Sequence, residues 1–164
     1  MTYKISPLIK SGLPGFTDIT TAPFIKIGEG YYYIESNGKK NWFDAYAACR
    51  LIGSELITID TIEEWNLVNK YLRDIKIDDA TYWTSGTDLT NTGKHVWFSN
   101  GLNINLDEIW FPGEPNNDKG VEHCDEMCFT SKGSQALFND KNCSTKNRYI
   151  CDTPSPKTAS FLVW

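Results

Sequence analysis

This 164-residue sequence has no long apolar run, no excess of positive charge and only two histidines. No apolar run approaches the roughly 18 residues that span a membrane, so we expect no membrane insertion. Sixteen basic residues against 21 acidic ones give a formal net charge of −5. Since no basic stripe is present either, we expect no nucleic-acid partner. With only two histidines and no nucleophile motif, a base–nucleophile pair such as His123 and Cys128 carries little weight, and we expect no enzyme.

The composition is typical of one globular domain. Apolar residues make up 40% of the chain, including six tryptophans, eight tyrosines and eight phenylalanines, and the length suits a single core. Prolines and glycines interrupt the first residues, and the last residues follow the final apolar pattern. We therefore expect a lead segment at 1–23, a domain at 24–152 and a tail at 153–164.

The five cysteines are unevenly spread, with four of them in the last 41 residues. Cys124, Cys128, Cys143 and Cys151 do not match a paired C-x-x-C zinc pattern, so a disulfide framework is the better interpretation. Disulfides persist in oxidising compartments, which predicts a secreted, extracellular protein. We expect its signal peptide to have been removed, because the first ten residues lack an apolar stretch. The odd count leaves one thiol free or paired with another chain.

Hydrophobic periodicity predicts an α+β fold. An alternating pattern around Gly28 and Gly30 indicates a hairpin. Two helices follow: one begins after the N-cap Asn41 and ends at Gly53, and the other covers 61–75 with Thr61 and Glu64 as a capping box. The remaining expected strands are short, and we place them at 56–60, 81–89, 93–101, 124–130, 135–140 and 147–152. Helices grouped before such strands are typical of α+β domains with antiparallel strands.

A polar, glycine-containing stretch at 101–120 is too long for an ordinary connection. Loops beyond roughly 12–15 residues are usually functional or disordered, and the tryptophan and two prolines here argue against disorder. The stretch contains "FPGEPNND" at 111–118, in which Glu114 and Asn116 flank a proline. Each residue alone is typical of a surface turn. Together they also supply two oxygen-bearing side chains.

Further oxygen donors precede two of the cysteines. Glu122 lies two residues before Cys124, and Asn139 and Asp140 lie just before Cys143. If those two cysteines are paired, these donors come to the same end of two adjacent strands, where the loop can fold over them. Three carboxylates and two amides without thiolate or imidazole suit Ca²⁺, which takes 6–8 oxygen ligands. Most single Glu, Asn and Asp residues are solvated surface groups, so only the joint arrangement favours a site.

Several segments together resemble the C-type lectin-like domains. The segments are, in chain order, "AYAACRLIGSEL", "YWTSGTDL", "WFPGEPNN", "EHC", "FND" and "YICD". The resemblance covers roughly 24–152 and implies a fold of two helices with antiparallel sheets and a long calcium-binding loop region. The Tyr-rich N-terminal hairpin is similar to secreted insect members.

The resemblance also implies a disulfide pairing. It pairs Cys49 with Cys151 and Cys124 with Cys143, which leaves Cys128 over. That residue is then either a buried, inert thiol or an intersubunit disulfide in a homodimer, and the sequence leaves both open.

The resemblance further implies one calcium site, made by the five oxygen donors, with a cis peptide bond before Pro115. The five are Glu114, Asn116, Glu122, Asn139 and Asp140. A second calcium ion is not expected, because Lys94 and His95 stand near Asp88 where the family has acids.

The implied function is calcium-dependent binding of carbohydrate. In this family Glu-Pro-Asn goes with mannose, N-acetylglucosamine and fucose-type sugars, and Gln-Pro-Asp goes with galactose. Two vicinal hydroxyls would bind the ion while Glu114, Asn116, Glu122 and Asn139 hydrogen-bond to them. The implied partners are glycans with mannose-type terminal sugars, recognised on pathogens or cell surfaces in innate immunity. The alternatives are a calcium-free protein-interaction domain on the same fold and a structural calcium ion without sugar binding.

Overall fold

A computed structural model describes residues 21–75, 79–129 and 136–153. The expected lead segment and tail therefore lie mostly outside the described residues. The chain enters through the predicted hairpin, in which β1 (Ile25–Ile27) pairs antiparallel with β2 (Gly30–Ile34). Gly28 supports the turn between them with a positive φ of 58°, a conformation that glycine adopts without strain.

Two helices follow, with the predicted N-caps. In α1 (Trp42–Leu51) the Asn41 side chain accepts a hydrogen bond from the backbone N–H of Asp44 at 2.8 Å. In α2 (Ile62–Asp74) the hydroxyl of Thr61 accepts from the backbone N–H of Glu64 at 3.1 Å. Each cap satisfies an N–H group that has no partner inside the helix.

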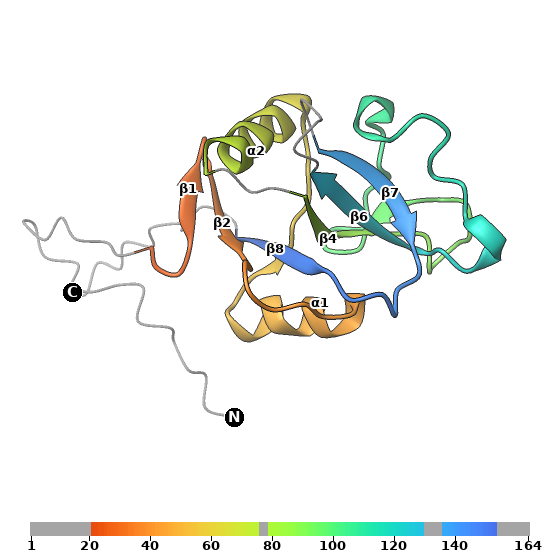
Figure 1. Cartoon of the computed structure of the whole chain (residues 1–164), viewed down its shortest axis with the longest axis horizontal. Helices are drawn as coiled ribbons and strands as arrows, with labels where there is room; N and C mark the ends of the chain where they lie inside the picture. The colour runs from red at the N-terminus through yellow and green to blue at the C-terminus, as the bar shows by residue number, and fades with distance from the viewer. Residues whose placement is uncertain (1–20, 76–78, 130–135, 154–164) are drawn as a thin grey trace, which may run out of the picture.

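The strands form one mixed sheet in the order β1-β2-β8-β4-β6-β7, with β3 paired to β8 and β5 paired to β4. The strands after the hairpin are β3 (Glu55–Leu56), β4 (Ala80–Thr87), β5 (Val96–Trp97), β6 (Cys124–Phe129), β7 (Leu137–Lys141) and β8 (Arg148–Thr153). The expected antiparallel pairing holds except between β4 and β8, which run parallel. Figure 1 shows α1 and α2 on opposite sides of β2 and β8.

Two predicted strands are shorter than expected. The strand expected at 93–101 contains only β5, because Gly101 donates its N–H to the carbonyl of Trp97 at 2.7 Å and closes a turn there. The strand expected at 56–60 begins one residue earlier and pairs only at Glu55 and Leu56.

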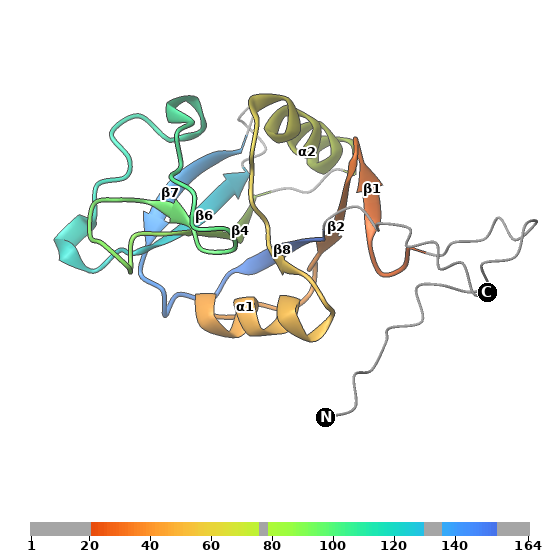
Figure 2. The ribbon, with the colours of Figure 1, turned by 180° about the vertical axis from the view of Figure 1, so that it is seen from behind.

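The core has two parts. One lies beneath α2 and includes Trp65, Leu72, Met127 and the fully buried Phe138. The other lies beneath α1, and its central residues are Trp42, Cys49, Leu56, Trp83, Cys124 and Tyr149. Seen from behind (Figure 2), the hairpin of β1 and β2 lies at one end of the molecule, and β6 and β7 lie toward the other.

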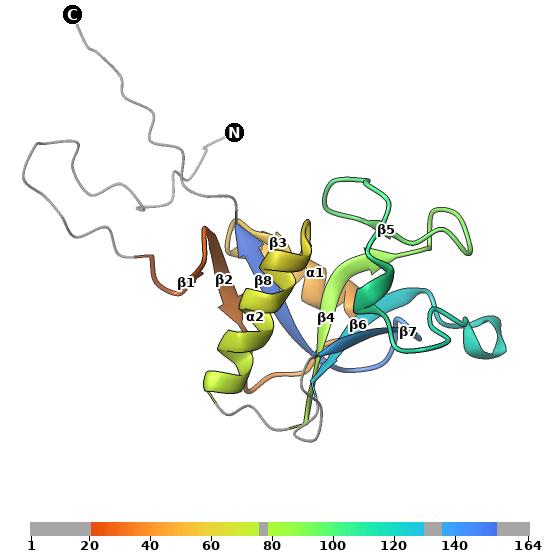
Figure 3. The same ribbon diagram turned by 90° about the horizontal axis from the view of Figure 1, so that it is seen from above.

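The loops between β4 and β6 gather at the β6–β7 end, away from the hairpin (Figure 3). They contain two short 3₁₀ turns, η1 (Asp107–Ile109) and η2 (Asp118–Gly120). Since β7 is the last strand of the sheet, this loop region lies beside an edge.

Candidate functional site

The loop that contains Glu114 is hydrogen-bonded to the edge strand β7. Phe111 donates its backbone N–H to the carbonyl of Phe138 at 2.9 Å. Further along, the backbone N–H groups of Asn116 and Asn117 donate to the two carboxylate oxygens of Asp140, at 3.1 and 2.7 Å. Asp140 is fully buried. Its carboxylate therefore anchors the loop, and charge-assisted hydrogen bonds of this kind are stronger than neutral ones.

Glu114 and Asn116 flank Pro115, and the peptide bond between Glu114 and Pro115 is cis, as the resemblance implied. The side-chain amide of Asn116 donates to Oε1 of Glu114 at 2.7 Å. The other oxygen of Glu114, Oε2, is buried and has no hydrogen-bond partner among the residues that the structure describes. Burial raises the pKa of Glu114, and the carboxylates of Asp140 and Glu122 raise it further. The carboxylates of Asp140 and Glu122 thus lie near enough to Glu114 to disfavour its ionised form.

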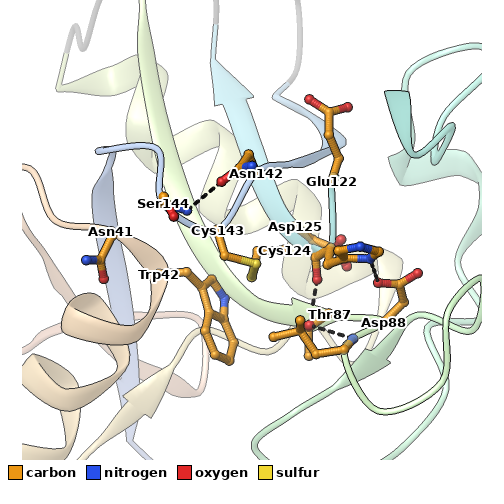
Figure 4. Close-up of a disulfide and its surroundings, with 12 residues drawn as sticks. Asn41, Trp42, Thr87, Asp88, Glu122, Cys124, Asp125, Asn142, Cys143 and Ser144 are labelled. Atoms are coloured by element: carbon orange, nitrogen blue, oxygen red, sulfur yellow. Dashed lines mark hydrogen bonds and ion pairs between the residues drawn. A yellow bond between two sulfur atoms is a disulfide. The ribbon is translucent and has the colours of Figure 1, made fainter. Parts of the chain in front are cut away.

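Glu122 lies two residues before Cys124, which begins β6. Its backbone N–H donates to Oδ1 of Asn117 at 3.0 Å, which ties it to the loop. Its carboxylate is mostly buried and accepts a hydrogen bond from the ammonium of Lys141 at 2.9 Å. Figure 4 shows its side chain projecting away from the neighbouring disulfide. The positive charge of Lys141 therefore offsets part of the negative charge of Glu122.

Asn139 is the one predicted ligand with a different contact. Its side-chain nitrogen donates to Oε1 of Glu126 at 3.0 Å, and not to any of the other four candidate ligands. It is nevertheless the chain neighbour of Asp140 on the edge strand. The structure therefore joins four of the five residues through the loop. The side chain of the fifth, Asn139, is held instead by Glu126, a residue that the sequence did not single out.

Two disulfides fix the strands that carry these residues. Cys124–Cys143 ties the start of β6 to the turn after β7, and Cys49–Cys151 ties α1 to β8, the same pairs that the resemblance implied. In the turn beside the first bond, Asn142 accepts the N–H of Ser144 at 2.9 Å (Figure 4). The Cys124–Cys143 bond thus brings the start of β6 and the end of β7 together, as expected if these two cysteines are paired.

The donor set fits a calcium ion. No side chain or backbone group in the described ranges donates to the buried Oε2 of Glu114, and the nearby carboxylates of Asp140 and Glu122 oppose its ionisation, so a cation at this oxygen would stabilise it. Within the described ranges, no three His, Cys, Asp or Glu side chains are grouped closely enough to hold a metal by themselves. A calcium ion here would therefore need the amide oxygens of Asn116 and Asn139 as well as carboxylates, a mixture typical of Ca²⁺.

With this geometry in place, comparison with known proteins gives the family. Residues 38–153 match the family model described as the Lectin C-type domain. The chain belongs to the C-type lectin family. This C-type lectin domain is 37% identical to "C-type lectin 37Da" of Drosophila melanogaster over 98% of the chain and 88% of that protein. It is 31% identical to "Salivary C-type lectin 1" of Aedes albopictus over 68% of the chain and 75% of that protein.

A solved structure supports the same assignment. The carbohydrate-recognition domain of cow CD23, determined in the presence of a GlcNAc2Man3 oligosaccharide, matches with a TM-score of 0.68 and 26% identity. The match covers 84% of this chain and 98% of that one. Family and fold together support carbohydrate binding in general, which is not an enzymatic activity. None of the described helices is long and apolar enough to cross a membrane.

Beneath the loops of this C-type lectin domain lies a polar cluster that sequence reasoning did not assemble. The carboxylate of Asp88 is hydrogen-bonded to Nδ1 of His123 at 2.8 Å. The carboxylate of Asp125 is hydrogen-bonded to Nδ1 of His95, also at 2.8 Å. Both carboxylates are fully buried. Burial raises the pKa of Asp125 to about 6 although His95 opposes the rise. Asp88 is thus hydrogen-bonded to a histidine side chain. The expectation of a single calcium ion remains a prediction.

Cys128 is the cysteine outside both disulfides. It lies within β6 and is only partly exposed, and burial raises the pKa of its thiol to about 12. A protonated thiol reacts slowly in disulfide exchange. The intersubunit disulfide stays a prediction.

Proposed function

We propose that this C-type lectin domain binds glycans through one calcium ion held by the five predicted oxygen donors. The observation that carries the proposal is the loop pinned on Asp140, with a buried oxygen of Glu114 that has no partner. A carboxylate oxygen in that position is costly unless a cation or a proton donor satisfies it. The five donors are Glu114, Asn116, Glu122, Asn139 and Asp140.

Sugar recognition follows from the chemistry of these side chains. Bound calcium supplies coordination positions for two neighbouring hydroxyl oxygens of a sugar. The amide groups of Asn116 and Asn139 donate hydrogen bonds to those oxygens, and the carboxylates of Glu114 and Glu122 accept the hydroxyl protons. The Glu-Pro-Asn order supports mannose, fucose or N-acetylglucosamine as terminal sugars. Few atoms of a monosaccharide are buried, so useful affinity requires several sites.

We place the protein outside the cell, where it would recognise glycans of pathogens or cell surfaces in innate immunity. The two disulfides and the similarity to a salivary insect lectin support secretion. A homodimer linked through Cys128 would provide two sites on one molecule.

The first test compares sugar binding with and without calcium. A glycan array and calorimetry with mannose should show binding that EDTA abolishes and added Ca²⁺ restores. Sugar binding that persists in EDTA would contradict the mechanism. Calcium binding without any glycan would instead assign the ion a structural role.

The second test concerns specificity. Glu114→Gln combined with Asn116→Asp exchanges the positions of one amide and one carboxylate while keeping the overall charge. Preference should move from mannose towards galactose, because the donors and acceptors around the ion are rearranged. The matched control is Asp118→Asn, an exposed neighbour that should leave the preference unchanged. An unchanged sugar ranking in the double variant would remove the basis for the specificity argument.

A calcium-free protein-interaction domain is the second candidate. One contact favours it, since the ammonium of Lys141 already neutralises part of Glu122. Under this alternative, Ca²⁺ produces no heat in calorimetry and no rise in the melting temperature. A calcium-dependent rise in both excludes it.

A further inference from the structure

A buried glutamate on β6 contacts the predicted ligand Asn139 from behind. Glu126 pairs directly with Asn139 across the β6–β7 ladder and is only 6% exposed. Its Oε1 accepts from the side-chain nitrogen of Asn139 at 3.0 Å, and its Oε2 accepts from that of Asn147 at 2.6 Å. The thiol of Cys128 adds a weak contact to Oε1 at 3.6 Å. Both carboxylate oxygens are therefore occupied by donors.

We propose that Glu126 is a positioning residue that fixes which end of the Asn139 amide faces outward. An ionised carboxylate only accepts hydrogen bonds, so the NH₂ group of Asn139 must be the end turned towards Glu126. The carbonyl oxygen then lies on the other branch of the amide, available as a ligand. One N–H of the same NH₂ group is used by Glu126, and the second remains for a sugar hydroxyl.

The orientation matters because the two ends of an asparagine amide have opposite effects on a cation. Its oxygen is a calcium ligand, whereas its NH₂ group would place hydrogens against the ion. Asn116 needs no such support, since its nitrogen already binds Glu114, another predicted ligand. For Asn139 the orientation is set by a residue outside the predicted ligand set. The calcium consequence rests on the proposed function, but the orientation itself does not.

The variant Glu126→Gln tests the proposal without changing the size of the side chain. Glutamine has one acceptor oxygen and one NH₂ group, yet it faces two amide NH₂ groups. One donor–donor conflict results, and we expect Asn139 to relieve it by rotating its amide, because Asn147 is the more buried of the two. Calcium affinity should fall by about 10–100-fold, as is typical when a residue that supports a metal ligand is removed.

A second substitution should restore the orientation. In Glu126→Gln with Asn147→Asp, the new carboxylate accepts from the NH₂ group of the glutamine. The glutamine oxygen is then free to accept from Asn139 again. This double variant has the same net charge as the natural sequence and changes no predicted ligand. Its calcium affinity should return most of the way to that of the natural protein, leaving a loss well below about tenfold, the lower end of the effect expected when such support is removed. Glu63→Gln, an exposed change of the same type on α2, is the control.

Two readouts separate the proposal from a purely structural role. Calorimetry gives calcium affinity, and NMR of the calcium-free protein gives the side-chain amide protons of Asn139, which a hydrogen bond to a carboxylate shifts and protects from exchange. We expect both signals to change in Glu126→Gln and to return in the double variant, with Glu63→Gln unchanged. Natural calcium affinity and unchanged Asn139 signals in folded Glu126→Gln would overturn the proposal.

Two other outcomes also decide whether Glu126 orients Asn139. If Glu126→Gln does not fold, the folded double variant decides: normal calcium affinity supports the proposal, and weak affinity overturns it. If the natural protein binds no calcium, the proposed function fails, but the Asn139 signals still test the orientation. Shifted, protected signals that disappear only in Glu126→Gln would support it, and signals typical of a solvated amide in the natural protein would overturn it.

Discussion

Asp140→Asn should release one half of the loop anchor in the calcium-free protein. Each oxygen of Asp140 accepts one backbone N–H, from Asn116 at 3.1 Å and from Asn117 at 2.7 Å. Asparagine keeps the shape but has one acceptor, so its NH₂ group must face one of these N–H groups. A lost hydrogen bond to a charged group costs about 1.5–3 kcal/mol.

The expected signal is local. A cost of that size corresponds to a loss of roughly 10–150-fold in hydrogen-exchange protection at one of the two amides. The free energy of global unfolding should change less, because the substitution also removes a negative charge beside Glu114, whose pKa Asp140 helps to raise. Hydrogen exchange of the loop amides, followed by NMR alongside chemical denaturation, measures both quantities.

A control and a refuting result follow from the same geometry. Asp118→Asn removes an exposed carboxylate from the same loop, 3.8 Å from the ammonium of Lys119, and should change stability by less than about 0.5 kcal/mol. If the amides of Asn116 and Asn117 keep their protection in folded Asp140→Asn, the carboxylate does not anchor the loop.

Two further predictions concern pH. Burial, with Glu64 and Asp60, raises the pKa of Asp152 to about 7, although the backbone N–H of Thr58 opposes the rise. The folded state therefore binds this proton more tightly than the unfolded state, and the free energy of unfolding falls as pH rises from about 4 to 7. Asp152→Asn should remove this slope and stabilise the protein at pH 8 by on the order of 1–3 kcal/mol, with little effect at pH 4. Equal changes in the free energy of unfolding at both pH values would contradict this prediction. Because the pKa of Glu114 is raised, calcium affinity should start to fall at a higher pH than for an ordinary glutamate, and a titration showing constant affinity from pH 7 to 5 would contradict this.

Local features of the fold could be predicted from the sequence because neighbouring residues determine them. The caps at Asn41 and Thr61 depend on contacts only three residues away, and both are present. The parallel pairing of β4 with β8 could not be predicted, since it joins segments more than 60 residues apart whose apolar patterns fit either direction. The length of β5 was overestimated because the turn closed by the Gly101 N–H on the carbonyl of Trp97 leaves only Val96 and Trp97 in the strand.

The same distinction applies to the site. Motifs in the chain identified the five oxygen donors, but the contacts that hold them depend on strand register. Glu126 reaches Asn139 only because β6 and β7 pair at those positions. Lys141, at the end of β7, reaches Glu122, which lies two residues before β6. His95 and Asp125 likewise meet from a loop and a strand that are 30 residues apart. No spacing rule in a single sequence supplies these cross-strand contacts.

The docking of the loop on β7 has a consequence for solubility. As the last strand of the sheet, β7 has one side where backbone N–H and C=O groups could recruit a strand from another molecule. The loop covers part of that side, since Phe111 takes the carbonyl of Phe138 and Asp140 holds the next turn. The segment that carries Glu114 and Asn116 therefore also covers a strand edge that could pair with another molecule. Conditions that detach it expose, together with the site, a surface for self-association.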